Sequence, residues 1–197
     1  MSDCTGNLTA DILFDCINAP VGGIEQNVLI VKKDDVKVST ITVDPDNDLV
    51  VTGLELNTGA LAYKLTGVKQ SNSKAWELVK KENAPDKFKH TFSGVIFNPS
   101  AENKMQAAAL AKGAKYVIII EQVWKGAGSK DAFEILGLSS GLEISTMTNS
   151  SKENDNMIMF ELASADGFEE ATMPKNFLDG TYAATKALFD NKLVPVV

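Results

Sequence analysis

The sequence predicts a β-rich α+β fold: a β-sandwich or small barrel of antiparallel strands, with one packed helix and a short C-terminal helix. Two observations predict it. Nine stretches are rich in Val, Ile, Thr and aromatic residues or alternate apolar with polar residues, which is typical of strands. Two other stretches combine helical spacing of apolar residues with capping residues, and this order of elements favours a sheet with a helix packed on it.

Short polar connections join the predicted strands, and several contain Gly, Ser, Asn or Asp, as hairpins require. In the run 36–44, Val36 and Val38 are expected on one face, and Ile41 and Val43 on the other. The nine strands are predicted at residues 26–32, 36–44, 48–56, 60–67, 88–97, 115–124, 131–137, 141–148 and 156–163.

One helix is predicted between strands and one near the end of the chain. The first covers residues 98–113, with Asn98 as a candidate N-cap and Gly113 as the stop. A narrow stripe of small and apolar residues is expected to lie on a sheet, and it consists of Ala101, Met105, Ala108 and Ala109. The second helix covers residues 179–193, with Thr181 as its cap.

Two extensions of the body are predicted. A proline and two glycines at positions 20–23 separate an N-terminal arm, residues 1–20, from a single β-rich domain, residues 21–197. Residues 68–87 are predicted as an extended loop with no more than one helical turn, because they have helical composition but lie between strands. Extensions of this kind are what a subunit uses to reach its neighbours.

The stretch DPDNDLVVTGLE has the ligand spacing of an EF-hand calcium loop, with Asp44, Asp46, Asp48 and Glu55 at the matching positions. Its sixth residue is Leu49, where that loop needs glycine for a sharp turn. The stretch also joins two predicted strands and not two helices. It therefore predicts a solvated β-turn whose Asp side chains bind nearby backbone amides, and a calcium site of another kind remains the alternative.

Charge and apolar content limit the classes of partner. Lys and Arg number 19 against 26 Asp and Glu, a formal charge of −7. This opposes tight binding of nucleic acid, because that affinity comes from Lys and Arg. We expect no membrane partner, because no run approaches the ~20 apolar residues of a spanning helix. Cys4 and Cys16 are expected to be free thiols in a protein made in the cytoplasm.

The sequence contains few residues with the spacing of a catalytic or metal site. His90 is the only histidine, and it lies in a predicted strand. One histidine and two cysteines cannot make the common zinc sites within one chain. Glu169 and Glu170 are adjacent, so their side chains diverge and do not predict an acid–base pair. We therefore expect no enzyme activity, no cofactor and no catalytic or metal-binding residues.

Three blocks of the chain resemble virion structural proteins of tailed bacteriophages, and most of all tail-tube or tube-like ring subunits. They are KYVIIIEQVWKGAGSKDAFEILGLSSGLEIS, DNMIMFELASADGFEEATMP and TKALFDNKL, and the resemblance spans roughly residues 12 to 190. It implies rings, typically hexamers, of a β-barrel or sandwich subunit with one helix, a long loop and an arm. The long loop would be residues 68–87 and the arm residues 1–20.

The same resemblance implies location in the virion, self-association, other virion proteins as partners, and a channel through which DNA passes unbound. The chain is longer than many tube subunits, and residues 164–180 have no obvious counterpart in them. A collar or connector ring, a capsid auxiliary protein or a non-viral soluble binding module therefore remain alternatives.

Two sets of candidate residues follow. An aromatic residue among mixed charges is a common interface composition, so the subunit interface is predicted at Trp76, Leu78, Val79, Lys80 and Lys81. An acidic bore would repel phosphates, and its lining is predicted from Asp44, Asp46, Asp48, Glu55 and Glu143, with Glu153 and Asp155 as further candidates.

Overall fold

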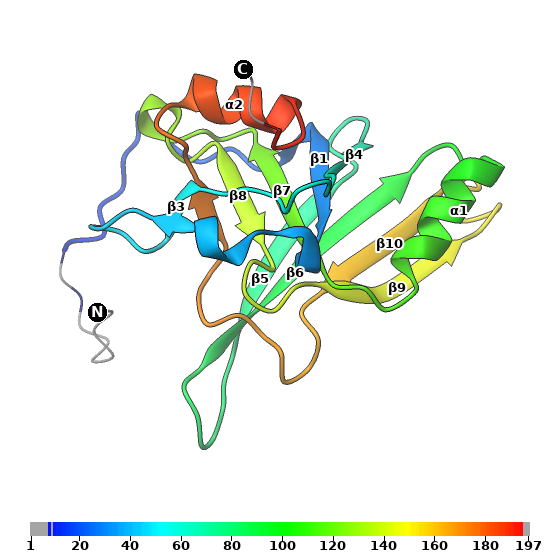
Figure 1. Cartoon of the computed structure of the whole chain (residues 1–197), viewed down its shortest axis with the longest axis horizontal. Coiled ribbons are helices and arrows are strands. Elements are labelled where there is room, and N and C mark those ends of the chain that lie inside the picture. The colour runs from blue at the N-terminus through cyan, green and yellow to red at the C-terminus, as the bar shows by residue number, and fades with distance from the viewer. Residues whose placement is uncertain (1–7, 9, 195–197) are drawn as a thin grey trace.

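The computed structural model describes residue 8 and residues 10–194. Two β-sheets pack against each other, and a helix lies at the side of each (Figure 1). The larger sheet has the strand order β2-β3-β11-β8-β7-β1-β4. Its strands are β1 (Ile24–Lys32), β2 (Thr42–Val43), β3 (Val50–Gly53), β4 (Tyr63–Thr66), β7 (Tyr116–Gln122), β8 (Phe133–Leu136) and β11 (Lys175–Phe177).

The smaller sheet has the order β5-β6-β10-β9. Its strands are β5 (Ser73–Val79), β6 (Lys87–Ile96), β9 (Glu143–Asn149) and β10 (Ile158–Ala163). All pairings in the described residues are antiparallel except that of β11 with β3. The predicted strand-rich α+β class is confirmed, and two open sheets make it sandwich-like and not a closed barrel.

The central strands of the larger sheet are buried on both faces. One face packs on the smaller sheet through a cluster that includes Val28, Ile118, Phe92 and Phe160. The other face packs on helix α2 (Tyr182–Asp190), whose Phe189 is fully buried. Strands β1 and β7 are central to both clusters, and this is why their sequences are continuous apolar runs without alternation.

Helix α2 begins where the sequence predicts and is held by charge at one side. The Thr181 hydroxyl accepts a hydrogen bond from the Ala184 N–H at 3.2 Å, which confirms the predicted cap. Burial alone would raise the pKa of Glu121 on β7, but hydrogen bonds from Lys125 and from Tyr182 of α2 lower it overall. The Lys186 ammonium of α2 lies 3.3 Å from the same carboxylate, so Glu121 anchors the helix to the sheet.

Two predicted elements differ from the structure, and one strand was not predicted. The run 36–44 is wrong as a continuous strand: a 3₁₀ turn precedes it at Lys33–Asp35, a second lies within it at Val38–Thr40, and only Thr42–Val43 forms a strand, which pairs with β3. The centre of the predicted loop 68–87 is wrong, because it is strand β5 and pairs along its whole length with β6. Strand β11 was not predicted, since three residues carry too little pattern.

Helix α1 (Ala101–Leu110) is present, but its orientation differs from the prediction. Its cap is Ser100, which accepts from the Asn103 N–H, and not Asn98. The predicted contact stripe is exposed throughout: Ala101, Met105, Ala108 and Ala109. Ala107 is buried instead, and Leu110 packs against the core between the sheets.

Candidate functional site

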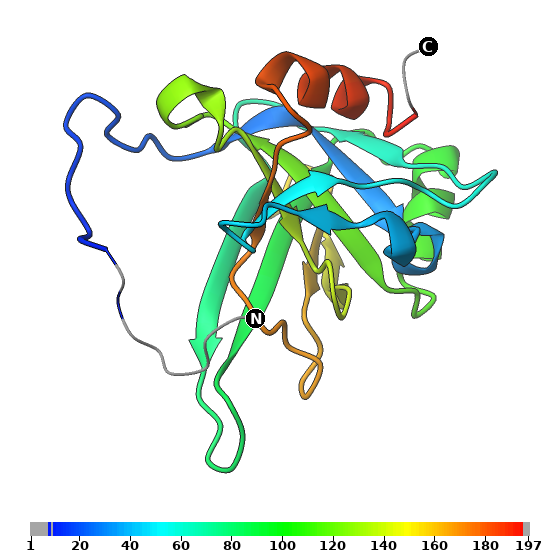
Figure 2. The same ribbon diagram turned by 60° about the vertical axis from the view of Figure 1, so that its left-hand side comes forward.

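Strands β5 and β6 form a long hairpin that extends past the rest of the smaller sheet. They pair from Ser73 opposite Ser93 to Val79 opposite Lys87. The neighbouring strand β10 pairs with β6 only from Thr91 to Ile96. The outer part of the hairpin therefore projects from the body (Figures 1 and 2).

The projecting part carries apolar side chains on the face that continues the core. Strand alternation places Trp76 and Leu78 on the same face as the buried Phe92. Trp76 is nevertheless 45% exposed and Leu78 48% exposed. The ring of Trp76 contacts the ring of Phe88 edge-on, with 5.7 Å between centroids. We call Trp76, Leu78 and Phe88 the apolar ledge.

Ion pairs hold the root of the hairpin to the body. Lys74 of β5 binds Glu134 of β8, and so links the two sheets. Near the tip, the Lys81 ammonium lies 2.7 Å from the buried carboxylate of Glu169. The hydrogen bond from Lys81, supported by the Gly167 N–H, lowers the pKa of Glu169 to about 2. The hairpin is thus a fixed projection and not a free loop.

His90 is buried at the same root, and backbone groups occupy both ring nitrogens. Nδ1 accepts from the Gly137 N–H at 3.2 Å, so the proton is on Nε2, which donates to the Thr172 carbonyl at 3.0 Å. Burial lowers the pKa of His90, although the nearby Glu170 carboxylate opposes this shift. Glu170 in turn accepts from the N–H groups of Ser139 and Ser140. The histidine therefore joins the hairpin to the end of β8.

The arm is the second region of exposed apolar side chains. It leaves the body at Asn18, whose carbonyl accepts from the Trp124 indole N–H at 2.9 Å. Asp15 accepts from the Ile17 and Asn18 N–H groups and forms a turn there. Beyond it the exposed fractions are 80–89% for four apolar side chains, Ile12, Leu13, Phe14 and Ile17. Figure 2 shows this dark blue segment standing away from both sheets.

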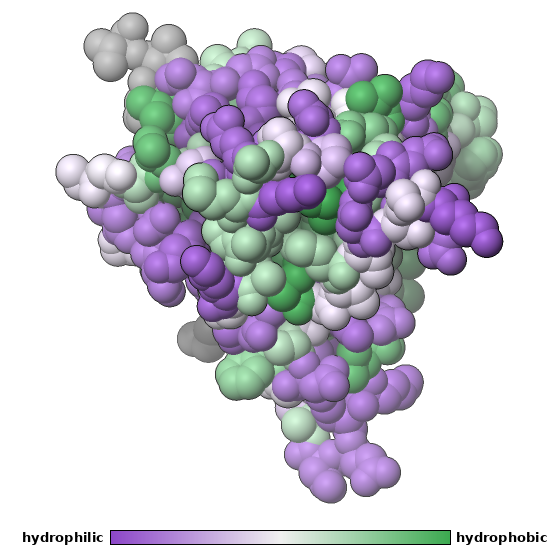
Figure 3. All heavy atoms as spheres, turned by 90° about the vertical axis from the view of Figure 1, so that its right-hand side faces the viewer, coloured by the Kyte–Doolittle hydropathy of each residue, from purple (hydrophilic) through white to green (hydrophobic). Residues whose placement is uncertain are grey.

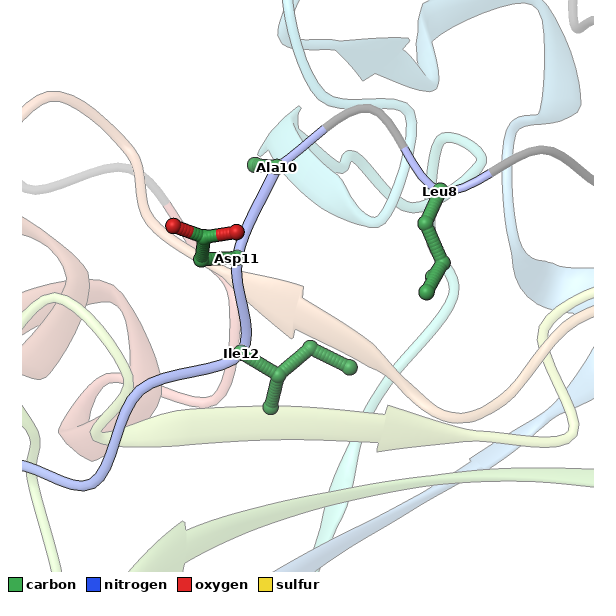
Figure 4. A pocket seen from close by; sticks show the side chains of 4 residues that line it. All are labelled: Leu8, Ala10, Asp11 and Ile12. Atoms are coloured by element: carbon green, nitrogen blue, oxygen red, sulfur yellow. The ribbon is translucent and has the colours of Figure 1, made fainter.

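The arm bends around a hollow of about 430 Å³ that is lined by Leu8, Ala10, Asp11 and Ile12. Figure 4 shows Leu8 and Ile12 on the inner side of this bend and Asp11 turned away from it. All four described lining residues belong to the arm, and three of them are apolar. The sequence predicts an arm here, but these side chains were not predicted as a site, although the run ILF within an arm is a signal for them.

The predicted interface residues lie at different places on the hairpin. Trp76 and Leu78 belong to the ledge, whereas Val79 points to the opposite face. Lys80 is exposed at the tip, with 84% of its side chain accessible. Lys81 is paired with Glu169 within the chain. Figure 3, which views the molecule from the α1 side, shows that the hairpin tip at the bottom is hydrophilic.

The predicted acidic lining is not one surface. Asp44, Asp46 and Asp48 lie in the β2–β3 turn, where the Asp44 carboxylate accepts from the Asp46 and Asn47 N–H groups. This confirms the predicted hairpin turn with side-chain-to-backbone bonds. Glu55 pairs with Lys37, and Glu143, on the other sheet, pairs with Lys115. Glu153 and Asp155 lie in the β9–β10 turn, at the opposite side of the molecule in Figure 1.

The described residues contain no group of three or more His, Cys, Asp or Glu side chains placed to hold a metal ion. Neither of their α-helices is long and apolar enough to cross a membrane. Cys16 is a free, exposed thiol on the arm, and Cys4 lies outside the described residues, as do residues 1–7, 9 and 195–197 of the predicted arm and domain.

An open hollow of about 310 Å³ lies on the outer face of the smaller sheet. It is lined mostly by hydroxyl-bearing and small residues, with one carboxylate: Ser71, Ser73, Ser93, Gly94, Val95, Thr146, Thr148, Met159, Phe160 and Glu161.

Comparisons of the chain with family models, curated proteins and solved structures found no match.

Proposed function

We propose that the protein is a structural subunit that assembles with copies of itself into rings or a tube, as tail-tube subunits of bacteriophages do. The observation that carries the proposal is the exposure of large apolar side chains on two projections, the ledge and the arm. Contiguous exposed apolar surface on a globular protein marks an interaction site, because burying it is favourable. Projections also reach beyond the body, where a neighbouring subunit lies.

The phage part of the proposal rests on the sequence resemblance, and the charge of the chain is compatible with it. A net charge of −7 per subunit, repeated around a ring, produces a negative field that keeps DNA from binding to the bore. Asp44, Asp46 and Asp48 are the best candidates to line it, because Glu55 and Glu143 are paired with lysines. Other virion proteins are the further partners, with a collar ring or capsid component as the alternative.

A binding module is the second candidate, and the hollow on the outer face of the smaller sheet favours it. Small-molecule sites are typically concave with a few convergent polar groups. This hollow has hydroxyls and the Glu161 carboxylate, but it is open and has no apolar floor of the usual extent. The binding module predicts a monomer at all concentrations.

Light scattering and negative-stain microscopy over a concentration series test the proposal. The wild-type chain is expected to form rings or tubes as the concentration rises. The double variant Trp76→Ser, Leu78→Ser is expected to stay monomeric and folded, because both side chains are half-exposed in the single chain. Val38→Ser, which removes a 66% exposed apolar side chain outside the hairpin, is the matched control and should assemble normally. A wild-type chain that remains monomeric throughout would contradict assembly.

A further inference from the structure

We propose that the arm of one copy adds as an extra strand to the free edge of β5 in a second copy, so that its apolar residues cover the ledge. This inference rests on the proposed self-assembly and names the surfaces that carry it. It follows from three properties of the described residues: an open strand edge, an uncovered apolar face beside it, and an unpaired apolar segment of opposite charge.

The edge of β5 is long and unpaired. Strand β5 lies at the end of its sheet and pairs only with β6 among the described strands, over seven residues. The two edges of the larger sheet are shorter, with two residues in β2 and four in β4. An unpaired edge of this length presents a row of N–H and C=O groups that another chain can bind. Proteins avoid such edges or use them for strand addition.

The edge of β9 has the same length but a different surface. Its exposed side chains are polar, and they are Ser145, Thr146, Thr148 and Asn149. Its apolar residues Ile144 and Met147 pack against the core between the sheets. Beside β5, in contrast, Trp76 and Leu78 are about half exposed. Strand addition at either edge would satisfy backbone groups. Only addition at β5 would also bury exposed apolar side chains.

The arm has the pattern that this edge requires. Residues 10–14 form no strand or helix within the chain, so their backbone is available for pairing. In an added strand, Ile12 and Phe14 lie on one face and Leu13 on the other. Ile12 and Phe14 would then cover the ledge, and both are at least 80% exposed in the single chain.

Charge favours the same pairing. Residues 1–31 contain no Lys or Arg, and the arm carries Asp11 and Asp15. The outer hairpin, residues 79–89, carries four lysines against Glu82 and Asp86. Opposite charges at the rim of an interface steer association and set its orientation, more than they add affinity. An acidic arm is therefore directed to the hairpin in preference to the acidic remainder of the molecule.

Disulfide trapping between two different copies tests the contact, because Cys16 is a natural probe in the arm. The first copy is Cys4→Ser, which keeps Cys16. The second copy carries Cys4→Ser and Cys16→Ser with one new thiol on the face of Trp76 and Leu78, from Lys74→Cys at one end of β5 or from Lys80→Cys just past the other. Both ends are needed because the added strand can run either way. The control partner carries Lys112→Cys, an exposed position beyond α1.

Mixed dimers are expected with oxidised glutathione for one of the two β5 positions, and not for the Lys112→Cys control. Adding Ile12→Ser and Phe14→Ser to the first copy should reduce the mixed product at least about tenfold, as loss of central apolar anchors does. These arm residues are exposed, so the variant is expected to keep the wild-type melting temperature.

Two outcomes would overturn the inference. One is assembly that proceeds while neither β5 position gives a mixed dimer; in this case the proposed self-assembly stands and only the arm contact fails. The other is equal trapping at the Lys112→Cys control. If the wild-type chain is monomeric by light scattering, both the inference and the proposed function fail.

Discussion

The inner face of the smaller sheet is covered at one end and partly exposed at the other. At the β9–β10 end, helix α1 lies over the sheet (Figure 1), and Leu110 packs into the cluster that contains Ile96 and Met147. At the β5–β6 end, Trp76 and Leu78 stay 45% and 48% exposed. Both ends present apolar side chains at strand spacing, yet only one end is covered. The chain thus covers one end with its own helix and leaves apolar side chains about half exposed at the other, where the proposed assembly would cover them.

The uncovered end is also the end that polar contacts hold in place. The ion pair of Lys74 and the backbone contacts of His90 and Glu170 fix the root of the hairpin, and the ion pair of Lys81 holds it near the tip. Apolar packing is non-directional, whereas hydrogen bonds and ion pairs specify one geometry. In the proposed assembly, such a fixed position would favour contact with a neighbouring subunit. Variants at the two ends should therefore differ in their effects on stability and on assembly.

The largest effect is expected from the root of the hairpin. Glu170→Gln removes the charge from a carboxylate that is 2% exposed and accepts from two backbone N–H groups. Hydrogen bonds to charged groups contribute about 1.5–3 kcal/mol, so the free energy of unfolding should fall by that amount in urea titrations. Glu77→Gln, an exposed change on the same hairpin, is the control and should stay within about 0.5 kcal/mol of wild type. Equal losses for both variants would contradict a specific role of the root.

A pair of leucine variants compares the two ends directly. Leu110→Ser exposes part of the core under α1 and should lower the free energy of unfolding by about 1–2 kcal/mol. Leu78→Ser should leave it within about 0.5 kcal/mol, because Leu78 is already 48% exposed, but it should weaken assembly. Urea unfolding and light scattering measure the two properties separately. The reverse pattern would mean that the ledge belongs to the core of the single chain.

The last effect is a dependence of stability on pH. Burial lowers the pKa of His90 in the folded chain below its usual value near 6.5. The facing Glu170 carboxylate opposes this shift, whereas the Lys74 ammonium, which is paired with Glu134, favours the neutral imidazole. The unfolded chain therefore takes up the proton first. The stability from neutral His90 is complete above pH 6.5 and falls as the pH drops through and below that value.

Urea unfolding of wild type and His90→Asn between pH 7 and pH 5 measures this dependence. The wild-type chain should lose more stability on acidification, since a protonated Nδ1 can no longer accept from the Gly137 N–H. Glu169, with a pKa of about 2, loses its contribution only below the usual range of Glu near pH 4.5, and so it does not confuse the comparison. Parallel pH profiles for the two chains would show that His90 does not titrate in this window.

The sequence by itself determined the elements whose signals are local. The apolar runs of β1 and β7 are strands in any environment that buries both faces, and they were predicted close to their observed bounds. Thr181 caps α2 because its hydroxyl meets an N–H three residues later, which needs no tertiary contact. The turn at Asp44 is of the same kind, since its carboxylate binds amides two and three residues away.

Only the tertiary structure decided the elements that depend on a distant partner. The segment SKAWELV has both helical composition and strand alternation, and its pairing with β6 selects the strand. The exposed stripe of α1 has the right spacing for a buried face, but the direction in which α1 packs buries Ala107 and Leu110 instead. Trp76 has the strand spacing of a core residue, yet it is 45% exposed, and this exposure depends on packing that no local pattern specifies. The candidate site could therefore be located in the sequence as a hairpin and an arm, whereas its exposed face came from the packing of the two sheets.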